Sequence, residues 1–273
     1  MIEFKNKPDK LQPVIASDNR LTETFDSYAE DYDLSFNNNF IGRYQRQRVH
    51  ELLAEQLTPS QFILDVGCGP GSDFAFYQKM NLSVEAIDVS KRMVQIARQR
   101  ASALIYNIDI HQSSLERFDT DRRYDVIILN FGVINAMDYF DKSMLKLKRL
   151  LHADGRLIII AMPPVHIFFI LEAMLKLRLK QTWQRMVQKY AVLPNGLKVH
   201  YFTKQDFKKH FCIEKAENLG AFMPTPHQYQ KRPFIRRYSQ WAMHLEQTIK
   251  TMLPTAIGGD HVYYALRPVR HNE

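Results

Sequence analysis

The stretch from Phe62 to Gly71, FILDVGCGPG, decides the fold of this chain. It opens with apolar residues interrupted by one acid, Asp65, a pattern typical of a buried parallel strand. Ser72 and Asp73, just after it, are residue types that cap a following helix. Between strand and helix, glycines at alternate positions let the backbone lie directly against a ligand: Gly67, Gly69 and Gly71. Strand, glycine turn and helix predict the first half of a nucleotide-binding α/β unit.

The acids around this turn indicate which nucleotide it binds. A dinucleotide turn has the spacing G-x-G-x-x-G and receives a pyrophosphate, whereas the spacing here is G-x-G-x-G. Asp65 precedes the first glycine by two residues, where a carboxylate would repel phosphate and attract a cation such as S-adenosylmethionine. Asp88, 21 residues after Gly67, has the spacing of an acid that binds ribose hydroxyls. The glycine spacing disfavours a dehydrogenase.

The segments ILDVGCGPG and AIDVSKRMVQIARQR resemble those of class I S-adenosylmethionine-dependent methyltransferases. They are most similar to the small-molecule type, such as quinone-biosynthesis C-methyltransferases. The resemblance extends from about Phe25 to Pro163, with weaker similarity as far as Arg267. It implies an α/β fold, a Rossmann-like doubly wound seven-stranded sheet with an antiparallel last strand, plus helical cap insertions. It also implies an enzyme whose cofactor is S-adenosyl-L-methionine.

The segment FDSYAEDYD, from Phe25 to Asp33, resembles the helical flap that covers the cofactor in this family. Tyr28 and Tyr32 are four residues apart, which predicts that they share one helix face. An aromatic face at this place favours the cationic sulfonium end of the cofactor. Packing on the domain surface is the alternative role for each tyrosine.

Other candidate cofactor-binding residues follow the predicted strands. Ligands bind at the carboxyl ends of strands in open α/β sheets, which favours the turn after the strand DVIILN. The resemblance implies that Met93 packs on the adenine, and that Ser113 or Ser114 replaces an aspartate usual in the family. The full predicted set is Tyr28, Tyr32, Asp65, Gly67, Gly69, Asp88, Val89, Met93, Ser113, Ser114, Leu115, Asn130, Phe131 and Gly132.

The chain is long enough for one large domain with a cap. We expect a lead-in and flap helix at 1–40 and the cofactor-binding core at 41–162. Cap insertions are expected at 163–200 and 221–259, converging above the cofactor, while 201–220 and 260–273 complete the core sheet. The expected strands include Ile105–Ile110, Arg156–Met162 and His261–Pro268.

The expected reaction is an in-line displacement of the methyl group from the sulfonium sulfur. The cofactor is itself the reactive electrophile, so the protein has mainly to align the acceptor and exclude water. A hydroxyl acceptor would benefit from a general base, and the candidates in the expected cap are His166, His200 and His227. Surface or packing roles are the alternative for each. Neither Cys68 nor Cys212 has the spacing of a metal ligand, so no metal is expected.

Positive charge is concentrated in the C-terminal third. The net charge is +8, and residues 163–250 hold 15 Lys and Arg against 5 Asp and Glu. Such a surplus attracts nucleic acid, an anionic membrane surface or an acidic substrate, or it is a solvated face. The many aromatic residues of this part favour a small, hydrophobic or aromatic acceptor. An RNA methyltransferase and a non-catalytic S-adenosylmethionine-binding protein are the alternatives, but no RNA-binding module or asparagine-proline-proline-aromatic motif occurs.

The polar N-terminus, MIEFKNKPDK, predicts no signal peptide, and the two cysteines fit a reducing cytoplasm. The apolar run after Pro164 is too short to span a bilayer. Peripheral contact with an anionic membrane is therefore the membrane role that stays open. The oligomeric state is open as well.

Overall fold

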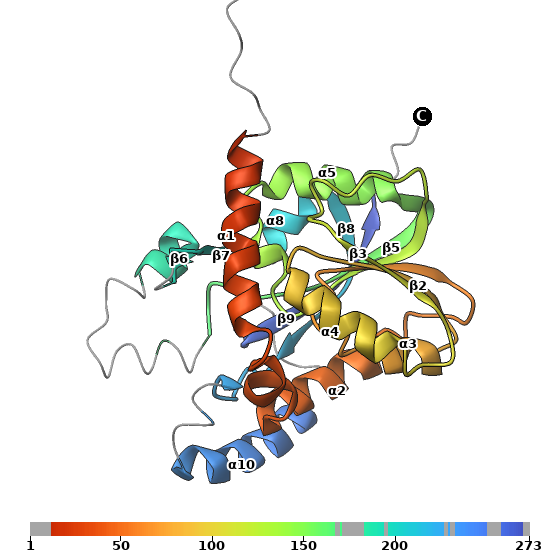
Figure 1. Ribbon diagram of the computed structural model, residues 1–273. Helices are drawn as coiled ribbons and strands as arrows, with labels where there is room; N and C mark the ends of the chain where they lie inside the picture. Colours follow the sequence, from red (N-terminus) through yellow and green to blue (C-terminus); the bar gives the residue numbers. More distant parts are fainter. Residues whose placement is uncertain are drawn as a thin grey trace, which may run out of the picture.

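The chain folds around one mixed sheet, shown in Figure 1. The computed structural model describes residues 12–166, 170, 183–193, 196–226, 229, 233–249 and 258–269. Seven strands follow the order β3-β2-β1-β4-β5-β9-β8, with β9 antiparallel to both of its neighbours. This confirms the predicted fold. The strands are β1 (Phe62–Val66), β2 (Ser83–Asp88), β3 (Ile108–Gln112), β4 (Tyr124–Leu129), β5 (Leu151–Ala161), β8 (Phe211–Leu219) and β9 (His261–Pro268).

The central strands are apolar because helices cover both faces of the sheet. Leu64 and Ile127 belong to one cluster of buried residues, whereas their neighbours Ile63 and Val126 belong to another. These alternating side chains place a core on each face. Helices of the first face are α5 (Phe140–Leu150) and α8 (Lys204–Lys208), and those of the second are α2 (Phe40–Ala54), α3 (Phe74–Lys79) and α4 (Lys91–Ala101).

Two strands have bounds that differ from those expected. β3 begins at Ile108 because its parallel pairing with β2 starts there, and Ile105 is instead 94% exposed. β5 begins at Leu151 because a register shift lets both Leu151 and Arg156 pair with β4. β9 has the expected bounds, His261–Pro268.

The flap is built from two pieces. α1 (Gln12–Tyr28) ends at Tyr28, and a turn leads into the short π-helix η1 (Asp33–Asn37). Tyr28 and Tyr32 therefore do not share a helix face, and that prediction was wrong. Phe36 packs on Phe131 with 4.8 Å between ring centroids. This contact packs the second piece of the flap on the loop after β4.

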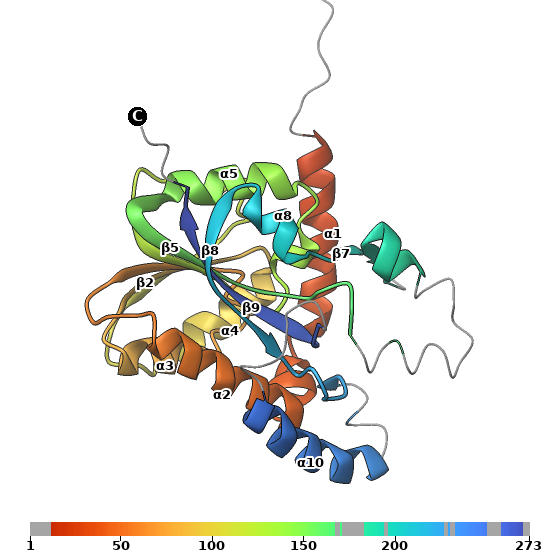
Figure 2. The ribbon, with the colours of Figure 1, turned by 180° about the vertical axis from the view of Figure 1, so that it is seen from behind.

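The two expected cap segments occupy separate places. In the first, η3 (Gln184–Gln188), β6 (Tyr190–Val192) and β7 (Lys198–His200) project from the core beside α1 in both views (Figures 1 and 2). We call residues 183–193 and 196–200 the β6–β7 arm. In the second segment, α10 (Pro233–Ile249) packs against α2 through an apolar cluster that includes Ile41 and Ala242. No helix among the described residues is both long and apolar enough to cross a bilayer.

Candidate active site

A pocket lies at the carboxyl ends of β1, β2 and β4, where the sequence predicts a ligand. It encloses about 810 Å³, including its open mouth. Its place at the ends of the central parallel strands is where open α/β sheets bind small ligands. It is lined by Leu21, Phe25, Tyr32, Val66, Gly67, Gly69, Ile87, Asp88, Val89, Met93, Ser113, Ser114, Leu115, Glu116, Asn130, Phe131, Gly132, Val133, Ala136 and Met137.

The glycine turn after β1 forms one wall of this pocket. Gly67 and Gly69 have φ angles of +71° and +55°, a region that residues with a Cβ disfavour. A Cβ at Gly67 would lie 2.5 Å from Cγ2 of Val133, whereas a Cβ at Gly69 would meet nothing within 4 Å. Gly67 thus allows the turn to pack tightly on the loop after β4. Gly69 leaves open space beside the backbone of the turn.

Asp88 ends β2 next to the glycine turn. Its Oδ2 accepts a hydrogen bond from the Gly69 amide and its Oδ1 accepts one from the Ser90 amide, both at 2.8 Å. Burial raises the pKa of Asp88 to about 6, although the two amide donors act in the opposite direction. The carboxyl group is therefore held in one orientation at the pocket wall and is mostly ionised at neutral pH.

The first helix, α1, closes one side of the pocket by binding the start of α4. The Asp26 carboxylate accepts hydrogen bonds from the Ser90 hydroxyl and the Arg92 amide. The N-terminus of a helix favours a negative charge at this position. These contacts hold two apolar residues of α1 in the pocket lining, Leu21 and Phe25.

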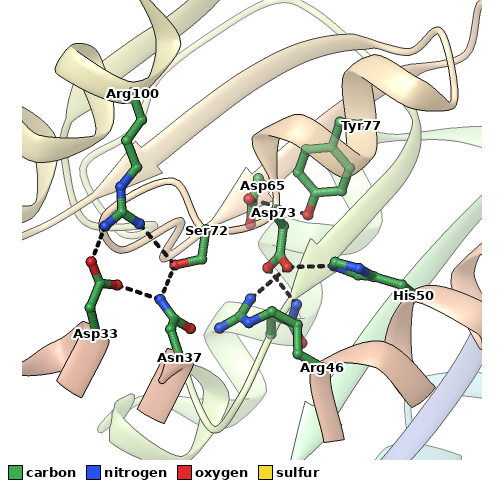
Figure 3. Close-up of polar contacts among 10 residues, drawn as sticks. Asp33, Asn37, Arg46, His50, Asp65, Ser72, Asp73, Tyr77 and Arg100 are labelled. Atoms are coloured by element: carbon green, nitrogen blue, oxygen red, sulfur yellow. Dashed lines mark hydrogen bonds and ion pairs between the residues drawn. The ribbon is translucent and has the colours of Figure 1, made fainter. Parts of the chain in front are cut away.

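Figure 3 shows a buried charge network, which lies next to the pocket because its member Asn130 is part of the pocket lining. Asp73 is at its centre, with Oδ1 2.5 Å from an Arg46 guanidinium nitrogen and 2.7 Å from Nε2 of His50. Its Oδ2 accepts a hydrogen bond of 2.9 Å from the side-chain nitrogen Nδ2 of Asn130. Burial alone would raise the pKa of Asp73, but Arg46 and His50 hold it well below its usual range. Asp73 is therefore a carboxylate that orients Arg46 and Asn130 from behind.

Asn130 is part of the pocket lining, and Arg46 lies next to the lining without being part of it. The guanidinium carbon of Arg46 lies 5.5 Å and 4.8 Å from the ring centroids of Phe36 and Phe131, contacts that favour a cation. Nε of Arg46 and Oδ1 of Asn130 are buried and find no hydrogen-bond partner among the described residues. Buried polar atoms are normally paired. An unpaired donor and an unpaired acceptor suit a ligand that carries both a carboxylate and an ammonium group.

A second set of hydrogen-bonded polar side chains joins the flap to the core (Figure 3). Arg100 forms an ion pair with Asp33 and donates to the Ser72 hydroxyl at 3.2 Å. Asn37 donates to both Asp33 and Ser72, at 2.5 Å and 2.7 Å. Asp73 is the N-cap residue of α3, as predicted, but neither its side chain nor that of Ser72 makes a capping hydrogen bond. Both side chains are engaged by the N-terminal part of the chain instead.

Most of the predicted cofactor-binding residues meet in this one pocket. They are Tyr32, Gly67, Gly69, Asp88, Val89, Met93, Ser113, Ser114, Leu115, Asn130, Phe131 and Gly132. The other two do not line it: Tyr28 is 52% exposed at the end of α1, and Asp65 accepts a hydrogen bond from Tyr77 at 3.2 Å. Burial, followed by the charge of Asp73, raises the pKa of Asp65 well above its usual range. The expectation that Asp65 attracts the cationic cofactor is therefore not supported, because Asp65 lies outside the pocket lining and its raised pKa favours the neutral form.

The candidate general bases occupy different places. His166 is fully buried, with Nε2 3.1 Å from a backbone carbonyl, and it is not part of the pocket lining. His200 ends β7, with Nε2 3.7 Å from Oδ1 of Asp138, and burial lowers its pKa. The His200 carbonyl accepts a hydrogen bond of 2.6 Å from Asn135, in the loop that lines the pocket. His227 lies outside the described residues.

Sequence reasoning missed Arg46, although the sequence holds a signal for it. In α2 the buried positions include Gly42, Val49 and Leu53. Arg46 follows Gly42 by four residues and precedes Val49 by three, so it falls on the same face as these residues. A charge at a position where the helical period predicts an apolar residue indicates a buried partner. That partner, Asp73, is distant in the sequence.

Comparison with known proteins identifies the family. A model of the methyltransferase domain matches residues 57–224, more than half of the chain. The chain belongs to this methyltransferase family. It is a class I S-adenosylmethionine-dependent methyltransferase, similar to those of quinone biosynthesis, and its cofactor is S-adenosylmethionine. These findings confirm the resemblance seen in the glycine turn and around Asp88.

Individual relatives are distant. The chain is 29% identical over 109 residues to (S)-tetrahydroprotoberberine N-methyltransferase of Eschscholzia californica, covering 38% of this chain and 30% of that enzyme. It is 25% identical over 142 residues to the ubiquinone/menaquinone biosynthesis C-methyltransferase UbiE of Hydrogenovibrio crunogenus, covering 50% and 56%. The chain thus matches less than two thirds of either relative.

The fold also matches a solved structure. The 1,6-didemethyltoxoflavin-N1-methyltransferase of Burkholderia thailandensis, solved with 1,6-didemethyltoxoflavin and S-adenosylhomocysteine, superposes with a TM-score of 0.61. The two chains are 14% identical, and the match covers 97% of this chain and 94% of the other.

Proposed function

We propose that this methyltransferase transfers the methyl group to a small, hydrophobic or aromatic acceptor by in-line displacement. The observation that carries the proposal is the pocket at the carboxyl ends of the central strands. One part of it presents Asp88, and another adjoins the unpaired atoms of Arg46 and Asn130. An acid for ribose hydroxyls and a donor–acceptor pair for an amino acid group match the two polar ends of the cofactor.

Residues of the pocket have separate proposed roles in holding the cofactor. Each Asp88 oxygen accepts one backbone hydrogen bond and retains a second lone pair, which leaves capacity for the ribose hydroxyls. Met93 and Leu115 provide apolar walls for the adenine. The open space beside Gly69 admits the ligand against the backbone of the turn.

The acceptor is proposed to bind against the loop after β4. Val133, Ala136 and Met137 line the pocket there, and apolar walls favour a hydrophobic acceptor while they exclude water. The bound cofactor supplies an activated methyl group. The chain contributes alignment of the acceptor. His166 and His200, the candidate bases that the structure describes, are not part of the pocket lining, so the proposal assigns no general base.

The proposal is tested in two steps. Titration calorimetry should show binding of S-adenosylhomocysteine and none of NAD, which is the matched control. Methyl-labelled S-adenosylmethionine should then label hydroxylated aromatic or quinol acceptors and not RNA. Tight NAD binding without S-adenosylhomocysteine binding would contradict the cofactor site. If only RNA carries the label, the chain is an RNA methyltransferase and the proposed small-molecule acceptor is wrong. If the cofactor binds but no acceptor is labelled, the result favours a non-catalytic S-adenosylmethionine-binding protein.

A further inference from the structure

Exposed apolar side chains gather on the β6–β7 arm. Trp183, Met186 and Val187 are 53%, 41% and 61% exposed, and Val192 on β6 is 59% exposed. Met186 and Val187 lie on the π-helix η3 and Trp183 directly precedes it, so the three exposed side chains are neighbours in one short element. Large apolar side chains grouped in this way on a projecting element mark an interaction surface. The arm extends away from the core sheet in Figures 1 and 2.

The arm is firmly attached to the core on its opposite side. Arg185 is buried, donates to the carbonyls of Pro163 and Pro164 at 3.1 Å, and lies 4.4 Å from the ring centroid of Tyr201. Lys189 pairs with Asp206 at 3.0 Å. These contacts fix the orientation of the short helix. Trp183, Met186 and Val187 are therefore exposed on an element whose other side is packed against the core.

The stretch of sequence that contains the arm has a surplus of positive charge. Residues 173–200 contain six Lys and Arg and no Asp or Glu. Among the described ones, Lys198 lies 4.4 Å from the ring centroid of Tyr190 on the paired strand. Basic residues next to Trp and aliphatic side chains are the combination that binds the surface of an anionic bilayer. Trp is also favoured at the membrane–water interface, because its ring is apolar and its N–H is polar.

We propose that the β6–β7 arm is a docking surface for an anionic lipid bilayer, with Trp183, Met186 and Val187 inserted at the level of the headgroups. The arm is also connected to the pocket: Asn135 donates to the carbonyls of Met162 and His200. Docking would therefore bring the mouth of the pocket near the membrane, where a hydrophobic acceptor is concentrated. The inference goes beyond the proposed function, and its test uses neither cofactor nor methyl transfer.

The test uses the two tryptophans of the chain, Trp183 and Trp241. Trp241 lies on α10 and is 59% exposed, which makes it a matched reference. The probes are vesicles of equal parts phosphatidylglycerol and phosphatidylcholine, and vesicles of phosphatidylcholine alone. In the Trp241→Phe variant, the emission of Trp183 should shift to the blue with anionic vesicles and be quenched by brominated lipid. In the Trp183→Phe variant, the emission of Trp241 should not change.

A second measurement tests the contribution of the apolar side chains. The triple variant Trp183→Ser, Met186→Gln, Val187→Ser should partition onto anionic vesicles at least tenfold more weakly than the parent, and Trp241→Ser should partition like the parent. High salt should weaken binding of the parent. Both variants should bind S-adenosylhomocysteine like the parent, which shows that they are folded.

Four results would overturn the proposal. They are equal binding to neutral and anionic vesicles, no binding to anionic vesicles at low salt, a triple variant that partitions like the parent, and a blue shift of Trp241 rather than Trp183. Concentration-dependent self-association that the triple variant abolishes, without vesicle binding, would assign the surface to a second copy of the chain.

Discussion

Asp73 and Arg46 form a buried ion pair whose place suggests a role in ligand binding. A buried ion pair is weak evidence for stability, because the desolvation of two charges offsets their attraction. Here Asp73 contacts Arg46, His50 and Asn130 together, while one nitrogen of Arg46 stays unpaired. The network therefore holds Arg46 beside two residues of the pocket lining, Asn130 and Phe131, and leaves one of its nitrogens for an anionic group.

Removing this cation should affect one end of the cofactor. We expect Arg46→Met to weaken S-adenosylhomocysteine binding by about 1.5–3 kcal/mol, the cost of a lost hydrogen bond to a charged group. Binding of 5′-methylthioadenosine, which lacks the carboxylate and ammonium, should change far less. Calorimetry with both ligands measures the difference.

The same variant leaves Asp73 without its main partner, so the double variant Arg46→Met, Asp73→Asn serves as a control for folding. In the double variant, too, binding of S-adenosylhomocysteine should weaken more than binding of 5′-methylthioadenosine. An equal loss for both ligands in both variants would show that Arg46 acts on the fold and not on the carboxylate.

Asp88 should make cofactor binding depend on pH. Ribose hydroxyls donate to a carboxylate, so affinity for S-adenosylhomocysteine should rise as the pH rises through about 6 and level off above it. The stability of the unliganded chain should respond in the opposite direction. A raised pKa favours the protonated folded state, so this contribution is complete below about pH 4 and is lost as the pH rises through about 6.

Asp88→Asn should remove this pH dependence and weaken binding by roughly 1–3 kcal/mol. Asp109→Asn, on the neighbouring strand β3, is the matched control because the Asp109 side chain is 60% exposed. Calorimetry between pH 5 and 8 measures the effect. A pH profile that is the same in the parent and in Asp88→Asn would remove Asp88 from the ribose site.

For helix caps, what the sequence can predict depends on how far apart in the chain the two contacting residues are. Ser90 caps α4 by accepting from the Met93 amide at 3.0 Å, and Thr203 forms a capping box with Asp206. Both interactions close within three residues, so their pattern is visible in the sequence. Asp73 has the same local appearance, but its carboxylate is taken by Arg46, 27 residues earlier.

The candidate site divides in the same way. The glycine turn and Asp88 could be predicted because the glycine spacing and the acid 21 residues after Gly67 form a recognisable pattern, although the contacts that fix them are tertiary. The place of Arg46 depends on how α2 packs, and the place of the arm depends on contacts of Arg185 with Pro163 and Pro164. A single sequence does not display such tertiary contacts.

The attachment of α10 should weaken as pH rises. Glu246 of α10 is 2% exposed and accepts hydrogen bonds from the Gly220 and Phe222 amides at 2.6 Å and 3.4 Å. Burial raises its pKa to about 7. Since the folded state favours the protonated form, the stability contribution is complete below about pH 4 and is lost as the pH rises through about 7.

Urea unfolding at pH 5 and pH 8 tests this expectation. Glu246→Gln should lose less stability than the parent between these two values, because glutamine keeps an oxygen acceptor and does not titrate. Glu30→Gln is the control, since the Glu30 side chain is 71% exposed. If Glu246→Gln and the parent lose equal stability, ionisation of Glu246 is not coupled to folding.

At the scale of the whole molecule, cofactor binding and the cap segments should be separable. No described residue of 163–200 or 221–259 belongs to the pocket lining. Replacing residues 164–199 by a short Gly/Ser linker should therefore leave S-adenosylhomocysteine affinity within about tenfold, or 1.4 kcal/mol. Methyl transfer to the natural acceptor should be lost. A folded variant that keeps full activity would show that this segment does not select the acceptor.

The position of β9 has a consequence for synthesis of the chain. β9 enters between β5 and β8, and Leu157 of β5 pairs with Leu266, 109 residues later. Until His261–Pro268 emerge from the ribosome, β5 ends the sheet with an open edge, and β8 has yet to be joined to it. Pairing over such a separation is slow, and open edges recruit strands from other chains. The nascent chain is therefore most prone to aggregate in the interval just before its last strand is made.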